Sequence, residues 1–222
     1  MGIVQDQLRL STHKRRALFE KEMMSLHGDR YTQYRRDYKR AGLFEFEPEF
    51  PIYVMFEQTY RCNLRCPSCI QGYKPARENF KDDTKRMSID TFKKVIDECS
   101  REKCPSISMH SNDEPLLVKD LEKRIRYAKD SGIMEIIMTT NGSLLTKERF
   151  HELADAGLTN LLFSTDAATP EVYAQTRPGG NFERVVEMMK YIKEYKKENE
   201  TSIPYTRASF VQSLLNAHET QA

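Results

Sequence analysis

Short apolar runs alternate with amphipathic segments from residue 52 onward, and this alternation limits the folds open to the chain more than any other feature. The runs have the composition of strands, whereas the segments between them repeat their apolar residues at helical spacing. Strands joined by crossover helices pair in parallel, with right-handed connections. The sequence therefore predicts an α/β fold with about five parallel strands, at residues 52–56, 106–110, 133–139, 160–164 and 205–211.

Local boundary signals agree with this pattern. Thr169 is an N-cap residue followed by Pro170 at the first helical position, and Gly132 and Gly157 stand where helix C-caps are expected. The pattern fits either a doubly wound sheet or a (β/α) barrel. Both architectures bind ligands at the C-terminal ends of their strands, so we expect functional residues in the loops that follow the strands.

The N-terminal region is predicted to be a separate helical extension over residues 1–47, with two helical pieces between residues 11 and 40 that Gly28 interrupts. Pro48 and Pro51 mark the start of the main domain, residues 48–222, because a proline disfavours helix at the residue before it. The arginines and tyrosines of the extension fit contact with RNA or a carrier as well as they fit solvated helix faces.

Charge and hydropathy exclude several classes of protein. The formal net charge is only +2 although 31% of the residues are charged, so a nucleic acid partner is not expected. No apolar stretch is long enough to cross a bilayer and the N-terminus has no signal-peptide pattern, so we predict a cytoplasmic protein without membrane contact. Three of the five cysteines lie between residues 62 and 69, which is unlike a disulfide framework.

Cys62, Cys66 and Cys69 follow directly after the first predicted strand, with three and then two residues between them. A compact loop can direct all three thiols to one point. A cubane iron–sulfur cluster held by three thiolates keeps one iron free for another ligand. Buried structural cysteines and a structural zinc site are the alternatives; zinc requires a fourth ligand, and the nearest histidine, His110, lies on another strand.

The loop at residues 62–69 resembles the C-x₃-C-x₂-C signature of radical S-adenosylmethionine (SAM) enzymes. The resemblance implies a partial (β/α) barrel in which the three cysteines hold a [4Fe-4S] cluster. In that family SAM chelates the fourth iron, and an electron from the cluster cleaves SAM to methionine and a 5′-deoxyadenosyl radical that abstracts hydrogen. A small electron donor such as flavodoxin or ferredoxin is then the expected protein partner.

Three later segments are similar to further motifs of this family, in the family's order. Residues 110–117 resemble its Gly-Gly-Glu-Pro segment, with Asn112 and Asp113 in place of both glycines. Residues 139–142 resemble its Thr-Asn-Gly turn, and residues 164–167 resemble its Ser-x-Asp segment. The SAM-binding residues implied by the resemblance are Asn112, Glu114, Pro115, Thr140, Asn141, Ser164, Asp166 and Arg177, the last as a bidentate partner of the SAM carboxylate.

Other positions have less specific roles. Ser68 stands where the family usually has an aromatic residue near the adenine, and Tyr73 and Phe80 are candidate substitutes. Cys99 lies on the apolar face of its predicted helix, so we expect Cys99 and Cys104 to be structural rather than ligands of an auxiliary cluster. No residue is assigned to catalysis.

The resemblance is closest to the peptide-modifying and sulfatase-maturing (SPASM-type) branch of the family, although five strands stand where the family usually has six, and the cysteine-rich C-terminal extension of that branch is missing. Another segment, a partner or a second copy of the chain is then expected to complete the barrel. The predicted function is that of a radical SAM enzyme acting on an unidentified peptide, carrier-bound or small-molecule substrate. The alternative is an inactive iron–sulfur or zinc binding partner or assembly protein.

Overall fold

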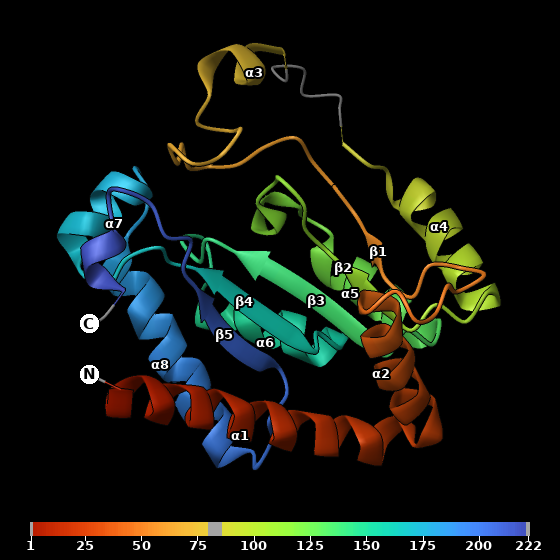
Figure 1. The fold of residues 1–222 in the computed structure, drawn as a ribbon. Coiled ribbons are helices and arrows are strands. Elements are labelled where there is room, and N and C mark those ends of the chain that lie inside the picture. Colours follow the sequence, from red (N-terminus) through yellow and green to blue (C-terminus); the bar gives the residue numbers. More distant parts are fainter. Residues whose placement is uncertain (1, 80–85, 221–222) are drawn as a thin grey trace.

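The computed structural model describes residues 2–79 and 86–220, and it has one parallel sheet with helices packed against it (Figure 1). The sheet order follows the chain order, β1-β2-β3-β4-β5, and all pairings are parallel. A doubly wound sheet reverses its strand order at a switch point, so the unbroken order identifies the barrel arrangement. Among the described strands, β1 and β5 each pair on one side only, which confirms the predicted partial barrel of five strands.

The strands lie close to their predicted positions. The prediction for β4 is confirmed residue for residue, whereas β1 and β2 are shorter than predicted and β5 ends two residues earlier. Beyond β1, the Phe56 N–H still donates to the Ser108 carbonyl at 2.9 Å, so the pairing continues past the end of the strand. The bounds are β1 (Val54–Met55), β2 (Ser106–Ser108), β3 (Glu135–Thr140), β4 (Asn160–Ser164) and β5 (Tyr205–Ser209).

Helices cover one face of the sheet. Several begin at a side chain that accepts a backbone N–H, and Thr169 before Pro170 is one of these N-caps, as predicted. Gly157 ends its helix in the left-handed region at φ 110°, which confirms its predicted C-cap role. The helices of this face are α4 (Ile89–Arg101), α5 (Leu121–Asp130), α6 (Lys147–Ala156), α7 (Pro170–Thr176) and α8 (Phe182–Glu198). The short helix α3 (Lys74–Asn79) lies away from the sheet (Figure 1), and two 3₁₀ turns, η1 (Pro115–Leu117) and η2 (Ala217–Glu219), complete the described elements.

The main core lies between the sheet and these helices. Alternate strand residues point into it, because successive side chains of a strand face opposite sides of a sheet. Cys99 and Cys104 are buried in this core, at 0% and 2% exposed, in agreement with the structural role expected for them. The strand residues of the core are Ile107, Ile136, Met138, Leu161 and Phe163, together with Met109 just after β2.

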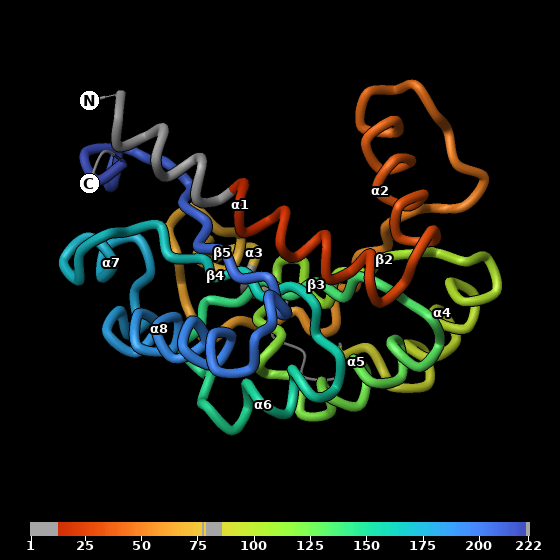
Figure 2. Tube along the Cα trace, turned by 90° about the horizontal axis from the view of Figure 1, so that it is seen from below, coloured from red at the N-terminus to blue at the C-terminus, as the bar shows by residue number. Residues whose placement is uncertain are grey.

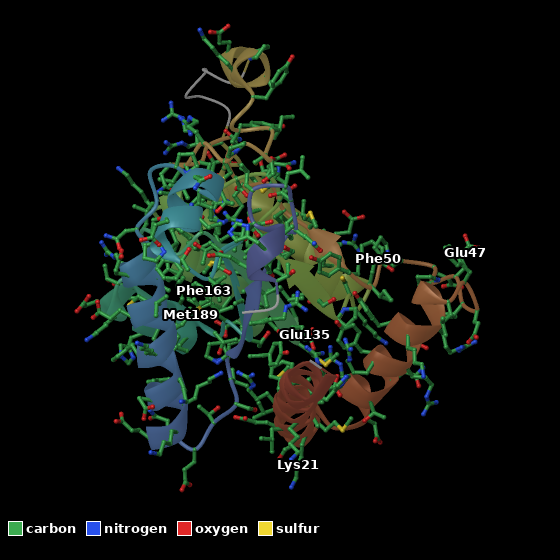
Figure 3. The ribbon with its side chains drawn as sticks, turned by 60° about the vertical axis from the view of Figure 1, so that its left-hand side comes forward. Lys21, Glu47, Phe50, Glu135, Phe163 and Met189 are labelled. Carbon is green, nitrogen blue, oxygen red and sulfur yellow. The ribbon has the colours of Figure 1, made fainter. Side chains whose placement is uncertain are left out.

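Helices α1 (Gly2–His27) and α2 (Asp29–Gly42) lie on the other side of the sheet from α5 and α6, across the N-terminal ends of the strands (Figure 2). Gly28 separates them, with a positive φ of 58° that glycine adopts without strain. Figure 3 shows Glu135, the first residue of β3, next to α1. None of the helices in the described residues is long and apolar enough to cross a membrane.

Candidate active site

The three cysteines of the signature lie on the loop that follows β1, at the C-terminal end of the sheet. All three are free thiols; Cys66 is buried, and Cys62 and Cys69 are partly exposed. Leu64, 1% exposed, anchors the loop to the protein, and the Cys69 N–H donates to the Cys66 carbonyl at 3.0 Å. A Cβ at Gly72 would lie 2.1 Å from the Cys66 carbonyl oxygen, so only glycine fits where the loop turns back on itself.

Hydrogen-bond donors approach two of the sulfurs from three parts of the chain. The Leu64 N–H lies 3.4 Å from the Cys62 Sγ, and the Asn141 Nδ2 lies 3.7 Å from it. The Arg177 Nη1 lies 3.7 Å from the Cys66 Sγ. These donors surround the sulfurs with N–H groups, which is how proteins commonly stabilise metal-bound thiolates.

The protonation of the thiols favours a metal-ligand role over a nucleophilic one. Burial raises the pKa of the Cys62 thiol and of the Cys66 thiol, although the Arg177 guanidinium works against the rise at Cys66. A thiol with a raised pKa is a poor nucleophile at neutral pH, whereas coordination to a metal removes its proton outright.

Three cysteines can hold an iron–sulfur cluster without a fourth protein ligand, whereas a structural zinc site needs one. No three His, Cys, Asp or Glu side chains within the described parts of the chain are close enough to hold one metal ion. The His110 Nδ1, considered as a fourth zinc ligand, accepts the Thr139 N–H at 3.0 Å. A cubane binds its thiolates on separate iron atoms, so the sulfurs need not converge on one point. The buried Arg177 Nε, which has no hydrogen-bond partner, is a further donor at this site.

Glu114 connects the cysteine loop to the ends of two strands. It is 2% exposed; Oε1 accepts from the Thr140 hydroxyl at 2.6 Å and the Leu116 N–H at 3.2 Å, and Oε2 accepts from the Asn141 N–H at 2.9 Å. Its own N–H donates to the Arg61 carbonyl at 2.8 Å. Burial raises the pKa of Glu114 to about 7, because its donors only partly replace the lost water.

Asn141 extends this connection to the cysteines. Besides approaching Cys62, its Nδ2 donates to the Asn63 Oδ1 at 2.9 Å. Thr140 and Asn141 are 2% and 4% exposed, and Pro115 begins the buried turn η1. Glu114 after β2 and Asn141 after β3 therefore contact the cysteine loop.

The two residues that replace the family's glycines have different surroundings. The Asp113 carboxylate accepts the N–H groups of Gln58 and Thr59, both at 3.1 Å, and that of Ser111 at 3.0 Å. It thereby fixes the start of the cysteine loop, and burial raises its pKa to about 6. Asn112 is exposed, and its amide lies 3.5 Å from the Ser111 hydroxyl; no hydrogen bond among the described residues joins its side chain to the cysteine loop.

Asp166 and Arg177 form an ion pair beside Cys66, with the Arg177 Nη2 2.5 Å from the Asp166 Oδ2. The Asp166 Oδ1 accepts the Val211 N–H at 2.7 Å, and its carbonyl accepts from the Asn216 Nδ2 at 2.9 Å. Ser164, also predicted for SAM binding, is partly exposed at the end of β4. Two nitrogens of the Arg177 guanidinium are thus engaged by the protein itself.

The chain after β5 supplies site residues that the sequence interpretation missed. A cavity of about 350 Å³ lies beside Ser68 and Asp166. Nothing in the local sequence marks this segment, since the interactions of Asn216 depend on tertiary contacts. Tyr73, one proposed substitute for the missing aromatic, is 63% exposed, and Phe80 lies outside the described residues. The cavity is lined by Pro67, Ser68, Asp166, Thr176, Val211, Ser213, Leu214, Leu215 and Asn216.

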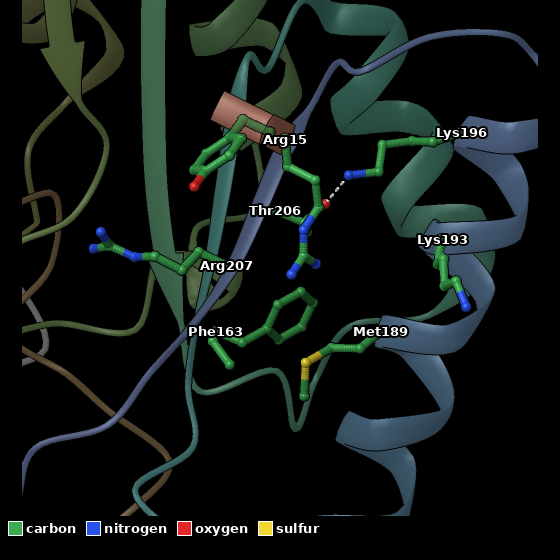
Figure 4. A pocket seen from close by; sticks show the side chains of 9 residues that line it. Arg15, Phe163, Met189, Lys193, Lys196, Thr206 and Arg207 are labelled. Carbon is green, nitrogen blue, oxygen red and sulfur yellow. Dashed lines mark hydrogen bonds between the residues drawn. The ribbon is translucent and has the colours of Figure 1, made fainter. Parts of the chain in front are cut away.

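A second cavity, of about 490 Å³, lies apart from the predicted site residues, between β5, α8 and α1 (Figure 4). Phe163 and Met189 form its apolar wall, and Arg15, Lys193 and Lys196 approach it. Burial, followed by the charge of Arg15, lowers the pKa of Lys196 to about 8. None of the cysteines or predicted SAM-binding residues lines this cavity.

Relatives of known function share only part of their length with this chain. A probable GTP 3′,8-cyclase of Methanococcus maripaludis is 39% identical over 127 residues, which are 57% of this chain and 40% of the relative. A PqqA peptide cyclase of Bradyrhizobium diazoefficiens is 36% identical over 115 residues, which are 51% of this chain and 28% of the relative. The chain thus spans less than half the length of these relatives.

The fold has a counterpart among solved structures. Streptococcus suis SuiB bound to S-adenosylmethionine matches 85% of this chain and 41% of its own with a TM-score of 0.61, at 16% sequence identity. The similarity to PqqA peptide cyclase agrees with the expected resemblance to the SPASM-type branch, and SuiB shares the fold. The model of the Radical SAM superfamily matches residues 56–206, which include the cysteine loop and the strands β2, β3 and β4. The chain belongs to the Radical SAM superfamily.

Proposed function

We propose that the chain is the core of an enzyme that uses a [4Fe-4S] cluster to cleave SAM reductively and to abstract hydrogen from a substrate. The observation that carries the proposal is the set of three free thiols on the loop after β1, with N–H donors from Leu64, Asn141 and Arg177 directed at two of them. Such a loop at the C-terminal end of a barrel strand lies where barrel enzymes bind their ligands.

Cys62, Cys66 and Cys69 would hold the cluster, which when bound supplies the electron for SAM cleavage. Glu114, with Thr140 and Asn141, fixes the neighbouring loops and offers a buried carboxylate to the SAM amino group. Ser164 and Asp166 would contact the ribose or methionine part of SAM. Pro115 would shape the loop that carries Glu114. Asn112 would contribute only through the backbone of its exposed loop.

The cavity beside Ser68 is the proposed place of the adenine, since it has apolar walls from Pro67, Val211 and Leu214 next to the cysteine loop. Apolar contact there would replace the missing aromatic stacking. A small one-electron carrier of the flavodoxin or ferredoxin type is the proposed reductant. Residues 48–222 are proposed as the core and residues 1–47 as a helical extension of a cytoplasmic protein.

The substrate belongs on the side of the sheet opposite to the helix-covered core. There His110 has its Nδ1 occupied as an acceptor, so its Nε2 carries the proton and is a neutral donor. Burial lowers the pKa of His110 to about 4, which keeps the ring uncharged at neutral pH. Peptide, carrier-bound and small-molecule substrates all remain compatible with such a donor.

The test is anaerobic reconstitution with iron and sulfide, followed by reduction, addition of SAM and measurement of 5′-deoxyadenosine. Cys66→Ala should remove the product, whereas Cys99→Ala, a matched loss of a thiol that lies in the core, should keep it. No nucleoside above the Cys66→Ala level would reject the enzyme proposal. A bound zinc ion without labile sulfide would instead favour the inactive binding protein.

A further inference from the structure

Arg177 lies at the cysteine loop although it follows Cys66 by 111 positions. It ends α7 (Pro170–Thr176), where its N–H donates to the Tyr173 carbonyl at 2.7 Å. The turn that follows packs on the cysteine loop: a Cβ at Gly179 would meet the Leu64 Cδ2 at 3.7 Å, and Gly179 itself has a φ of 89°. Tertiary packing therefore holds the Arg177 backbone against the segment between Cys62 and Cys66.

The guanidinium is oriented by a carboxylate and directed at a sulfur. Its Nη2 pairs with the Asp166 Oδ2 at 2.5 Å, and its Nη1 lies 3.7 Å from the Cys66 Sγ. The two side chains of the ion pair are only 12% and 5% exposed, so water screens the charges weakly. A planar guanidinium bound through one nitrogen has few orientations left for the other.

Asp166 is itself fixed from the C-terminal segment. Its Oδ1 accepts the Val211 N–H at 2.7 Å, and Asn216 donates to its backbone carbonyl at 2.9 Å. Asp166 also has a positive φ of 51°, a conformation that aspartate tolerates better than most non-glycine residues. The C-terminal segment thus fixes Asp166, and Asp166 in turn orients Arg177 toward the Cys66 sulfur.

We propose that Arg177 is a positioning residue that donates an N–H···S hydrogen bond to the Cys66 thiolate and raises the reduction potential of the cluster bound there. The inference rests on the proposed function, because it requires the cluster. Reduction adds one electron to the cluster and changes no covalent bond. A cation and a hydrogen bond at a ligand sulfur stabilise the reduced, more negative state, so they make the cluster easier to reduce.

This role differs from the expected contact with the SAM carboxylate. Two of the three guanidinium nitrogens already have partners in the protein, and only the buried Nε lacks one. A residue that acted only on SAM would leave the potential of the SAM-free cluster unchanged. A residue that acts on the sulfur changes that potential before SAM is added.

The experiment is a redox titration of the full chain, reconstituted anaerobically and without SAM, with the reduced cluster followed by electron paramagnetic resonance. Arg177→Gln should shift the midpoint potential to a more negative value, because it removes the cation and leaves Asp166 unpaired. Arg177→Lys, which keeps a charge but not the fork, should shift it less. A midpoint in Arg177→Gln equal to that of the wild type would overturn the inference.

Arg65→Gln is the matched control. Arg65 belongs to the cysteine loop, but its Nη1 donates to the carbonyls of Cys62 and Leu64, at 2.7 and 2.6 Å, rather than to a sulfur. Its removal takes one positive charge from the same loop and should move the midpoint less than Arg177→Gln does. Equal shifts in the two variants would show a general charge effect and reject the specific hydrogen bond.

A measurement on the wild type covers the case in which Arg177→Gln does not assemble a cluster. Protein labelled with ¹⁵N in its arginine side chains should give a ¹⁵N coupling to the reduced cluster in pulsed electron paramagnetic resonance, and Arg177→Lys should lose it. Absence of the coupling in the wild type rejects the inference while the cluster signal upholds the proposed function. A wild type that takes up no iron and sulfide rejects both.

Discussion

Each end of strand β3 contacts a buried glutamate carboxylate: Glu135 is the first residue of the strand, and Glu114 reaches its last residue from the loop after β2. The two glutamates differ in the groups that compensate their charge. Glu135 begins the strand and accepts from the Tyr31 hydroxyl at 2.6 Å, the Tyr34 hydroxyl at 3.2 Å and the Arg16 guanidinium at 3.3 Å. Glu114 contacts the other end through Thr140 and Asn141, and all its donors are neutral. Both side chains belong to residues that are 2% exposed.

The difference indicates a structural role for Glu135, here called the anchor, and agrees with the proposed ligand-binding role of Glu114. Glu135 meets a cation and two phenols from the N-terminal helices, so its charge is satisfied within the fold and holds those helices to the sheet. Within the part of the chain that the structure describes, the hydrogen-bond donors to the Glu114 carboxylate are all neutral, and burial raises its pKa to about 7. A carboxylate with such a raised pKa beside free thiols is typical of a functional site, where a ligand completes what the fold leaves open.

The largest effect is expected from breaking the anchor. Glu135→Ala leaves two buried phenol hydroxyls without their acceptor and should lower the free energy of unfolding by about 3 kcal/mol. Chemical denaturation of the cluster-free protein measures this change. Glu135→Gln, which keeps an acceptor for Tyr31, should cost less than half as much. A loss below about 1 kcal/mol in Glu135→Ala would show that the N-terminal helices are held mainly by apolar contacts such as Phe19 with Tyr205.

At the C-terminal end of β3, substitution of Glu114 should affect SAM binding more than stability. Glu114→Gln removes a charged acceptor from the site and should weaken SAM binding by about 2 kcal/mol, or roughly thirtyfold, while the fold keeps most of its hydrogen bonds. Calorimetric titration of reconstituted protein with SAM measures the affinity. Glu135→Gln serves as the control and should bind SAM like the wild type. Equal losses in the two variants would contradict the division between anchor and site.

The raised pKa of Glu114 also predicts a pH dependence with a definite sign. Burial raises it from 4.5 in the unfolded chain to about 7, so at intermediate pH the folded state holds a proton that the unfolded state has lost. Stability therefore falls as pH rises from 5.5 to 7, by roughly 1 to 2 kcal/mol from this group alone. The measurement is the difference between wild type and Glu114→Gln in denaturation at each pH.

Taking the difference removes groups that titrate independently of Glu114 and leaves its coupling to Asp113, whose charge raises the pKa of Glu114. Burial raises the pKa of Asp113 to about 6 and lowers that of His110 to about 4, and these two shifts act with opposite signs on stability. Both groups are present in the wild type and in the variant. A difference that does not change with pH would mean that the Glu114 carboxylate is ionised throughout this range.

The two glutamates also mark how far the sequence could predict the molecule. The alternation of apolar runs predicted the five strands, and the family motifs pointed to Glu114 and to the cysteines. No sequence pattern predicted that Glu135 is buried, because a charged residue at the start of a strand is usually exposed to solvent. Its partners Tyr31 and Tyr34 lie more than 100 positions earlier, and only the packing of α2 on the sheet brings them together.

The surroundings of the predicted site residues could not be predicted where side-chain contacts depend on distant segments. Asn112 stands in a motif position but is exposed, because Asp113 turns the loop by accepting the N–H groups of Gln58 and Thr59. Asn216 donates to the carbonyl of Asp166, and no local sequence pattern marks it. Spacing along the chain predicts which residues follow a strand, whereas the direction of each side chain depends on partners from other loops.

The smallest expected effect is also the most direct comparison, because each substitution deletes one hydroxyl that donates a hydrogen bond to one of the two glutamates. Tyr34→Phe and Thr140→Val should each lower the free energy of unfolding by about 1 kcal/mol, because each deletes one hydrogen bond to a buried carboxylate. Only Thr140→Val should also raise the pKa of Glu114 further, since the Thr140 hydroxyl lowers it. The decline of stability with rising pH should therefore continue to a higher pH in Thr140→Val than in Tyr34→Phe. Identical pH profiles in the two variants would mean that Thr140 does not control the ionisation of Glu114, and that the two ends of β3 differ in partners but not in electrostatics.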